Sequence, residues 1–333
     1  MTEHNERRDN GSVQALRRVT AKLGGAALLE QLADELSGTD LTTLLLEVFR
    51  RRALRLRPAE VLSRYRTDRF VAPGTVDAAA LRHAEGAMLA ALPAQFDVLT
   101  LAPVLPLGSH TATGHVDPRN VIATIRGSEV AADPTNGLAL EAAARRSELL
   151  HSDPRSAGQV RLAASQRVTR AQLFGGPVSF AHFQLLGAVT AGRDTGSHAF
   201  ESEHLAEHIG IGAAGLAALG LGRVTVAVTC LDDAAPRILA AVREQLDALP
   251  NIEVTEAPER ESGRAYYRCL CFKVFARRGN VDADQPGMEV ADGGFTNWTA
   301  ELLGNRKERL LISGYGLDRV AVLAADATTG RGS

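Results

Sequence analysis

Apolar residues recur at helical spacing along the first part of the chain. Leu28, Leu29, Leu32 and Leu36 share one face of a helix, and Asp40 opens a second segment with the same periodicity. The apolar face of that second segment consists of Leu41, Leu44, Leu45, Val48 and Phe49. Strand-like alternation is absent from this region. The pattern therefore predicts an α-helical N-terminal extension over residues 1–66.

The pattern changes after the Pro73-Gly74 turn. An alanine-rich helix is predicted over residues 78–92, and helices are also predicted at 134–150, 202–208 and 234–249. Between them lie short apolar runs typical of strands, at 96–101, 121–125, 161–172, 180–191, 224–228, 266–275, 288–291 and 310–313. A Gly175-Gly176-Pro177 turn separates two of these runs, which predicts an antiparallel hairpin. We expect residues 67–333 to form an α+β domain with a mostly antiparallel sheet flanked by helices.

Composition narrows the class of protein. The chain has 333 residues, 45% hydrophobic and 23% charged, with a net charge of −2. This balance is ordinary for a globular protein and gives no support for a nucleic-acid-coating role. The N-terminus lacks the apolar core of a signal peptide, and no apolar stretch reaches the roughly 20 residues of a membrane span. With only three cysteines, an odd number, we expect a cytoplasmic protein that is not membrane-bound.

A cluster of arginines follows the predicted N-terminal helices. Its members are Arg50, Arg51, Arg52, Arg55, Arg57, Arg64 and Arg66. A solvated helix face, or a contact with another part of the fold, is the interpretation we favour over a phosphate-binding or RNA-binding face. No aromatic side chain lies among these arginines before Tyr65, so base stacking has little support.

Two motif matches carry little functional weight. Residues 210–215, GIGAAG, match the dinucleotide fingerprint, but a helix precedes them where that fingerprint requires a strand. Small residues for close helix packing are the better interpretation. Residues 204–208, HLAEH, match the inverted zincin pattern, which would place His204 and His208 on one helix face. The surrounding sequence is polar enough to be an ordinary exposed helix, and whether a metal binds stays open.

The last strand-like run leads into a pattern suited to polyphosphate. In residues 311–320, LISGYGLDRV, Gly314 and Gly316 permit close approach of the backbone, and Arg319 begins a helix. A fixed arginine against a packed sheet can bind a phosphate in a bidentate manner. A structural arginine held in a salt bridge is the alternative.

This segment resembles motif 3 of class II aminoacyl-tRNA synthetases, and the histidyl-tRNA synthetases are the most similar group. Further resemblances follow in the family's order, at residues 70–77 (its opening P-x-G-T-x-D turn), 99–105 (motif 1), 133–137 (its R-P-E-G-T segment), and 266–272 and 293–297 (its two signatures). Together they cover residues 68–325. The resemblance implies a class II synthetase-like fold and a homodimer through the region around Pro103.

Residues 168–187 resemble motif 2, whose strand arginine contacts the α-phosphate of ATP in the family. Arg170 occupies that arginine's position, and Gln172 stands where the family has a glutamate that reads adenine. Phe183 begins the returning strand. The resemblance therefore implies ATP binding by Arg170, Gln172, Phe183, Gly316 and Arg319, with Mg²⁺ if the protein is catalytic. Arg170 and Arg319 are the expected catalytic residues.

The amino-acid pocket departs further from the family. The resemblance places Asp133, Thr135, Tyr266, Tyr267, Gly293 and Gly294 around the substrate. Ser262 replaces the family's catalytic arginine, unless Arg264 reaches the pocket from a shifted register. Leu185 and Val189 replace the polar residues that hold the ammonium of histidine. Because that ammonium would have no partner, histidine itself is not the expected substrate.

Two functions remain open. Only 13 residues follow Val320, where histidyl synthetases carry an anticodon-binding domain, so tRNA charging is not expected. The first function is a tRNA-independent ligase that adenylates an amino acid or a related small carboxylate and passes it to an amine or a carrier protein. The alternative is a non-catalytic subunit, resembling the regulatory subunit of ATP phosphoribosyltransferase, which would act on a partner enzyme.

Overall fold

The computed structural model describes residues 3–172, 180–249, 251–277 and 287–329. The chain forms two compact units, one of residues 1–67 with 124–127 and one of residues 68–123 with 128–333. The predicted Gly175-Gly176-Pro177 turn lies outside the described residues. The boundary between residues 66 and 67 stays a prediction.

The first unit is helical, as the apolar spacing predicted. Its helices are α1 (Glu3–Lys22), α2 (Ala26–Glu30), a π-helical turn (Gln31–Glu35), α3 (Gly38–Ala53) and α4 (Pro58–Thr67). Ser37 caps α3 by accepting a hydrogen bond from the backbone N–H of Asp40. No residue from 11 to 67 is buried, so the side chains described in this range do not form a buried core.

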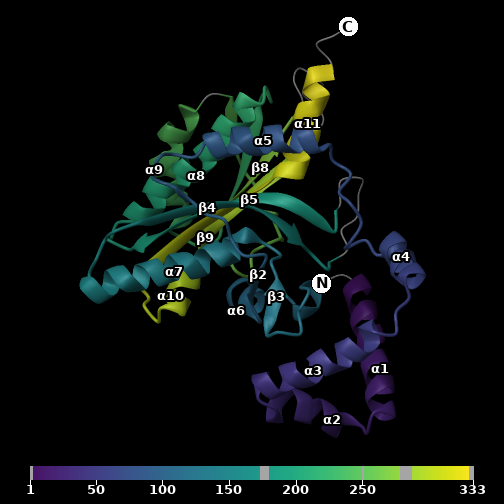
Figure 1. The fold of residues 1–333 in the computed structure, drawn as a ribbon. Coiled ribbons are helices and arrows are strands. Elements are labelled where there is room, and N and C mark those ends of the chain that lie inside the picture. Colours follow the sequence, from purple (N-terminus) through teal and green to yellow (C-terminus); the bar gives the residue numbers. More distant parts are fainter. Residues whose placement is uncertain (1–2, 173–179, 250, 278–286, 330–333) are drawn as a thin grey trace. The chain divides into compact units, whose positions relative to one another are not determined.

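The second unit is built on an eight-stranded sheet (Figure 1). The strand order is β1 (Asp97–Val98), β4 (Val160–Thr169), β5 (His182–Arg193), β10 (Glu308–Gly316), β9 (Met288–Thr296), β8 (Arg268–Ala276), β6 (Val224–Cys230) and β7 (Ile252–Glu256). The central pairs are antiparallel, and β1 with β4 and β6 with β7 are parallel. The predicted α+β fold with a mostly antiparallel sheet is therefore confirmed.

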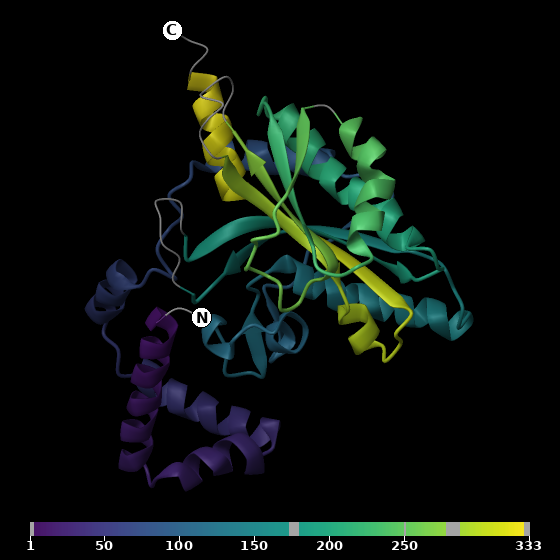
Figure 2. The same ribbon diagram turned by 180° about the vertical axis from the view of Figure 1, so that it is seen from behind.

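Helices cover both faces of this sheet (Figures 1 and 2). One face packs against α5 (Ala78–Ala90), α8 (Ala199–Ala218), α9 (Ala235–Asp247) and α11 (Leu317–Thr329), and the other against α7 (Pro134–Ser152) and α10 (Trp298–Leu302). Strand β10 shows the alternation that two buried faces require. Leu311 and Tyr315 belong to the first core, whereas Leu310 and Ile312 belong to the second.

A smaller substructure connects β1 to α7. It contains β2 (Val104–Pro106), α6 (Ser109–Gly114), a 3-10 turn (Pro118–Asn120) and β3 (Ser128–Val130), with β2 and β3 antiparallel. The strand predicted at residues 121–125 is wrong, because that segment makes only an isolated bridge between Ala123 and Glu129. The strand predicted at 96–101 is shorter than expected, since only Asp97–Val98 pairs with β4.

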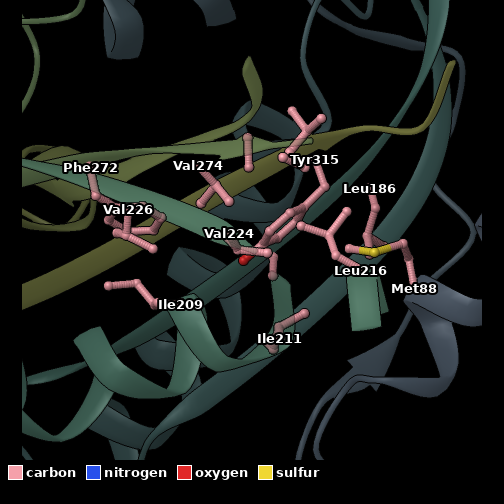
Figure 3. Packing of buried hydrophobic residues seen from close by; sticks show 14 of the residues in the cluster. Met88, Leu186, Ile209, Ile211, Leu216, Val224, Val226, Phe272, Val274 and Tyr315 are labelled. Carbon is pink, nitrogen blue, oxygen red and sulfur yellow. The ribbon is translucent and has the colours of Figure 1, made fainter. Parts of the chain in front are cut away.

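The glycine-rich motif of residues 210–215 lies inside helix α8. A Cβ on Gly212 would stand 2.8 Å from the Cε1 of Tyr315, and one on Gly215 would collide with the sulfur of Met88. Figure 3 shows Tyr315 and Met88 in this core, close to Leu216. These glycines let α8 approach α5 and the sheet closely, as the packing interpretation predicted.

The HLAEH segment is not the exposed helix that its polarity suggested. His204 and His208 are both fully buried. The two ring nitrogens of His208 form 2.9 Å hydrogen bonds with the hydroxyls of Thr190 and Ser313, which link α8 to β5 and β10. Among the described residues, no group of three or more His, Cys, Asp or Glu side chains is arranged to hold a metal.

Burial lowers the pKa of His208 from 6.5 to about 3, because the imidazolium would lose its hydration. The unfolded chain then binds the proton that the folded chain excludes. We expect the free energy of unfolding to fall by roughly 1 kcal/mol per pH unit as the pH drops from 6.5 to 5. Urea unfolding across this range should show a smaller slope for His208→Gln than for the wild type. The matched control is the exposed His83→Gln, and equal slopes for both variants would contradict the prediction.

Across the part of the chain that the structure describes, no helix combines the length and apolarity needed to cross a membrane.

Candidate functional site

A cavity of about 520 Å³ opens on the α7 face of the sheet. Residues of β5, β9 and β10 line it, together with Arg170 just after β4. Its predicted lining residues are Asp133, Thr135, Arg170, Gln172, Phe183, Tyr266, Tyr267, Gly316 and Arg319. Residues that are separated by up to 186 positions in the sequence (133 to 319) are thus brought to one place. The volume is typical of a small-molecule site.

Arg170 follows the end of β4 and is held by three contacts. Its Nε donates to the carbonyl of Ala132 at 2.9 Å, and its Nη2 donates to Oδ2 of Asp133 at 2.8 Å. The guanidinium lies 5.1 Å from the ring centroid of Phe183, a cation–π distance. The arginine is half-buried and oriented in advance, so little side-chain entropy remains to be lost on binding an anion.

Asp133 connects this arginine to helix α7. It is the N-cap residue, and its Oδ1 accepts hydrogen bonds from the backbone N–H and the hydroxyl of Thr135. Its other oxygen pairs with Arg170. Gly187 on β5 permits the close approach of α7, because a Cβ there would stand 2.8 Å from Pro134. The start of α7 is therefore fixed at the wall of the cavity.

A buried histidine supports the backbone of this wall. The Nε2 of His110 accepts a hydrogen bond from the backbone N–H of Ala132 at 3.0 Å, so its Nδ1 carries the proton and donates to Glu129 at 2.5 Å. Glu129 also accepts hydrogen bonds from the backbone N–H groups of Gly108 and His110. Burial would raise the pKa of Glu129, but these hydrogen bonds outweigh it and lower that pKa. The network positions the carbonyl that holds Arg170.

Arg319 lies on the first turn of α11 and lines the same cavity. Its Nη1 donates to the carbonyl of Glu289 at 2.8 Å, and within the described ranges no carboxylate lies at ion-pair distance from its guanidinium. Gly316 precedes α11 and would place a Cβ 3.8 Å from the Arg319 side chain. The salt-bridged structural role considered for Arg319 therefore has no partner among these residues.

An ion pair lies deeper along β9. Asp292 accepts two hydrogen bonds from Nη2 of Arg260, at 2.8 and 2.9 Å, and one from the hydroxyl of Tyr267 at 2.9 Å. Burial raises the pKa of Asp292, although the Arg260 charge opposes this, and burial also raises the pKa of Tyr267 well above its usual value. Tyr266 packs on Tyr267 with ring centroids 4.4 Å apart and lies 5.9 Å from Trp298. Burial raises the Tyr266 pKa to about 12, so all these phenols stay neutral at pH 7.

Three predicted residues do not line the cavity. Arg264 is exposed, donates to the carbonyls of Pro258 and Arg260, and is not among the residues that line the cavity. Gly293 and Gly294 belong to β9 but are not among the cavity's lining residues. A Cβ on Gly293 would stand 2.5 Å from Phe272, and one on Gly294 would stand 2.7 Å from Tyr267. Their role here is to let β9 pack closely against neighbouring side chains.

Several residues at the cavity were not predicted from the sequence, namely His110, Glu289, Asp292 and Trp298 in the lining, and Glu129 and Arg260 behind it. One signal for Asp292 was available, because it is a charged residue directly after the apolar pair Val290-Ala291 of a strand. No comparable signal separates Arg260 from the charged residues Glu259 and Glu261 beside it.

The fold is class II synthetase-like. It resembles an ATP phosphoribosyltransferase regulatory subunit/histidyl-tRNA synthetase from Bacillus halodurans at a TM-score of 0.56, with 14% sequence identity over 77% of this chain and 82% of that one. It also resembles a histidine–tRNA ligase subunit from Alicyclobacillus acidocaldarius at a TM-score of 0.56, with 15% identity over 78% of this chain and 97% of that one. Apo histidyl-tRNA synthetase from S. aureus follows at a TM-score of 0.54 (12%, 75% and 70%). No protein-family model and no curated protein sequence matches the chain. At these identities the similarity establishes the fold alone.

Proposed function

We propose that the protein is a tRNA-independent ligase that activates a small carboxylic acid with ATP. In this reaction a carboxylate oxygen attacks the α-phosphorus, the bond to the β-phosphate oxygen breaks, and pyrophosphate leaves. An amine or a carrier thiol then attacks the acyl carbon and AMP leaves. The observation that carries the proposal is the presence of Arg170 and Arg319 on the walls of one cavity in a class II synthetase-like fold.

Each arginine has a distinct part in the proposed reaction. Arg170 holds the α-phosphate, where charge accumulates during the attack, because it is fixed beside Asp133 before substrate binds. Arg319 holds the far end of the triphosphate. Phe183 offers an apolar ring face, and Gln172 offers an amide, for the adenine. These assignments follow the resemblance of the two motifs and the shared cavity.

The cavity also has a carboxylate suited to Mg²⁺. Glu289 lines it, keeps 35% of its side chain exposed, and forms a 2.8 Å ion pair with Lys273. Mg²⁺ prefers oxygen ligands and is commonly held by one or two carboxylates together with substrate phosphates. We propose Glu289 as such a ligand. The metal would neutralise charge on the phosphates, and the arginines of this chain would orient them.

The proposal is tested by ATP–pyrophosphate exchange with a broad panel of amino acids and other carboxylic acids. We expect exchange that depends on one acid or one chemical group of acids, and saturable ATP binding by calorimetry. Exchange should occur without added tRNA. No exchange with any acid, together with no ATP binding, would refute the ligase.

The alternative is a regulatory subunit that binds a ligand without turning it over. One observation favours it. Asp133 already forms an ion pair with Arg170, so a phosphate must compete with this carboxylate for the same guanidinium. Co-purification with an ATP phosphoribosyltransferase, and a change in that enzyme's rate on adding this protein, would support the alternative. Acid-dependent exchange by this protein alone would reject it.

A homodimer through the region of Pro103 stays a prediction. Its support is the exposure of two apolar side chains near that proline, Val98 at 54% and Leu107 at 59%.

A further inference from the structure

We propose that Asp292 determines specificity by accepting a hydrogen bond from a nitrogen of the substrate. This inference rests on the proposed function only in taking the substrate to be a small carboxylic acid. The substrate class would then be carboxylic acids that carry an N–H or ammonium group away from the reacting carboxylate. The argument depends on three features, namely the direction in which Asp292 faces, its remaining hydrogen-bonding capacity and its place in the cavity.

Of the two members of the ion pair, Asp292 faces the cavity and Arg260 does not. Asp292 lines the cavity and keeps 33% of its side-chain surface exposed, whereas Arg260 does not line it and its side chain is only 4% exposed. Arg260 is held from behind, since its Nε donates to the carbonyl of Ser262 and its Nη1 to that of Phe272. The guanidinium therefore serves as a fixed support, and the carboxylate is the member of the pair that a ligand can reach.

Asp292 has an acceptor position left over. Its Oδ1 accepts from both Arg260 and Tyr267, but among the described residues its Oδ2 accepts from Arg260 alone. Each carboxylate oxygen can accept about two hydrogen bonds. One further donor can therefore bind Oδ2. A charge-assisted hydrogen bond of this kind is stronger than one between neutral groups and requires a donor on the ligand.

The backbone is adapted to hold this arrangement. Gly263 has a φ of +80°, and a Cβ there would stand 2.9 Å from Nη2 of Arg260 and 2.9 Å from the Tyr267 ring. A side chain at this position would thus displace both donors to Asp292. Tyr267 is in turn seated on Gly294, where a Cβ would approach its ring to 2.7 Å. Two glycines thereby permit the contacts that orient one carboxylate.

The cavity lining places a cation and the Asp292 carboxylate at different positions along β9. The Arg319 guanidinium contacts β9 at Glu289, and Asp292 lies three residues further along, about 10 Å at the usual rise of a strand. The aromatic rings of Tyr266 and Trp298 line the cavity as well. An acid whose carboxylate faces the phosphates can therefore direct a nitrogen at its other end toward Asp292. A purely aliphatic acid would cover Asp292 and leave the free acceptor position on its Oδ2 without a donor.

The test uses the variant Asp292→Asn, which keeps the shape and removes the charge. Binding is measured by calorimetry, without ATP, for matched amino acids with and without a side-chain nitrogen: lysine and norleucine, ornithine and norvaline, histidine and phenylalanine. We expect the wild type to prefer at least one nitrogen-bearing member at least tenfold, and Asp292→Asn to lose that preference while its affinity for ATP stays unchanged. Tyr267→Phe removes a donor to Asp292 without removing its charge, so it should keep the preference.

A second variant guards against misfolding. Because Asp292→Asn leaves Arg260 buried without a counter-charge, the double variant Arg260→Gln/Asp292→Asn removes both charges and should show the same loss of preference. The inference is overturned if the wild type does not discriminate within any pair, or if it discriminates and both variants discriminate equally. Discrimination by a protein that neither exchanges pyrophosphate nor binds ATP would refute the ligase but support the role of Asp292, so the two proposals can fail separately.

Discussion

Replacing Arg170 by alanine should lower the rate of ATP–pyrophosphate exchange on the order of 100-fold or more, the usual effect of removing a group that stabilises transition-state charge. The reason is geometric. Arg170 is held by the carbonyl of Ala132 and the carboxylate of Asp133 before any ligand binds, so its loss removes a fixed cation that no flexible side chain replaces. Arg170→Lys should restore only part of the rate, since an ammonium lacks the planar two-pronged donor geometry.

The control for this experiment is Arg193→Ala. Arg193 ends β5, does not line the cavity, and makes a single 3.4 Å hydrogen bond to the carbonyl of Pro154. The Arg193→Ala variant should therefore catalyse ATP–pyrophosphate exchange at the wild-type rate. Thermal unfolding of each variant separates a catalytic loss from a folding defect. An Arg170→Ala protein with normal stability and normal exchange would contradict the role of Arg170.

Replacing Arg146 by alanine should destabilise the second unit by about 3–5 kcal/mol. Arg146 on α7 and Glu308 on β10 are both fully buried and form a bidentate pair with distances of 2.8 and 2.9 Å. Arg146 also donates to the carbonyls of Ser156 and Gly158, before β4. Its removal would leave the Glu308 carboxylate buried without a counter-charge and two carbonyls without this donor. Urea unfolding gives the measurement.

Its neighbour provides a matched control. Arg145 forms ion pairs with Asp97 and Glu141, but its side chain is 33% exposed. Because water can replace those contacts, Arg145→Ala should cost less than about 1 kcal/mol. The double variant Arg146→Met/Glu308→Leu should recover much of the lost stability, since it removes the unpaired charge. Equal losses for Arg145→Ala and Arg146→Ala would show that burial of the pair is not what matters.

The parts of the site that the sequence predicted are those encoded in short segments. Arg170 directly follows a strand, and Arg319 follows two glycines at a helix start, so local pattern and resemblance pointed to both. Asp292 and Arg260 form a pair across 32 residues, and His110 and Glu129 across 19. Such pairs arise only when the sheet and its loops assemble, and no local periodicity records them.

The fold shows the same division. The helices of the first unit and the long central strands have sustained periodic patterns, and these predicted the element types correctly. Residues 121–125 are rich in β-branched side chains but do not form a strand. The contacts of this segment explain why, because it forms one isolated bridge, between Ala123 and Glu129, and accepts a hydrogen bond from the N–H of Val130 at the carbonyl of Ile122. Propensity over five residues is too weak to override such tertiary contacts.

The contact between Asp133 and Arg170 implies that the cavity carries its own counter-ion. With no phosphate bound, the carboxylate of Asp133 neutralises the guanidinium at 2.8 Å, so folding does not bury an uncompensated cation. When a phosphate binds, it replaces the Asp133 carboxylate as the anion paired with Arg170. Asp133 also caps α7, and the released oxygen would then repel the incoming charge unless it turns toward the helix N-terminus. Ligand charge and the first turn of α7 are therefore coupled through a single carboxylate.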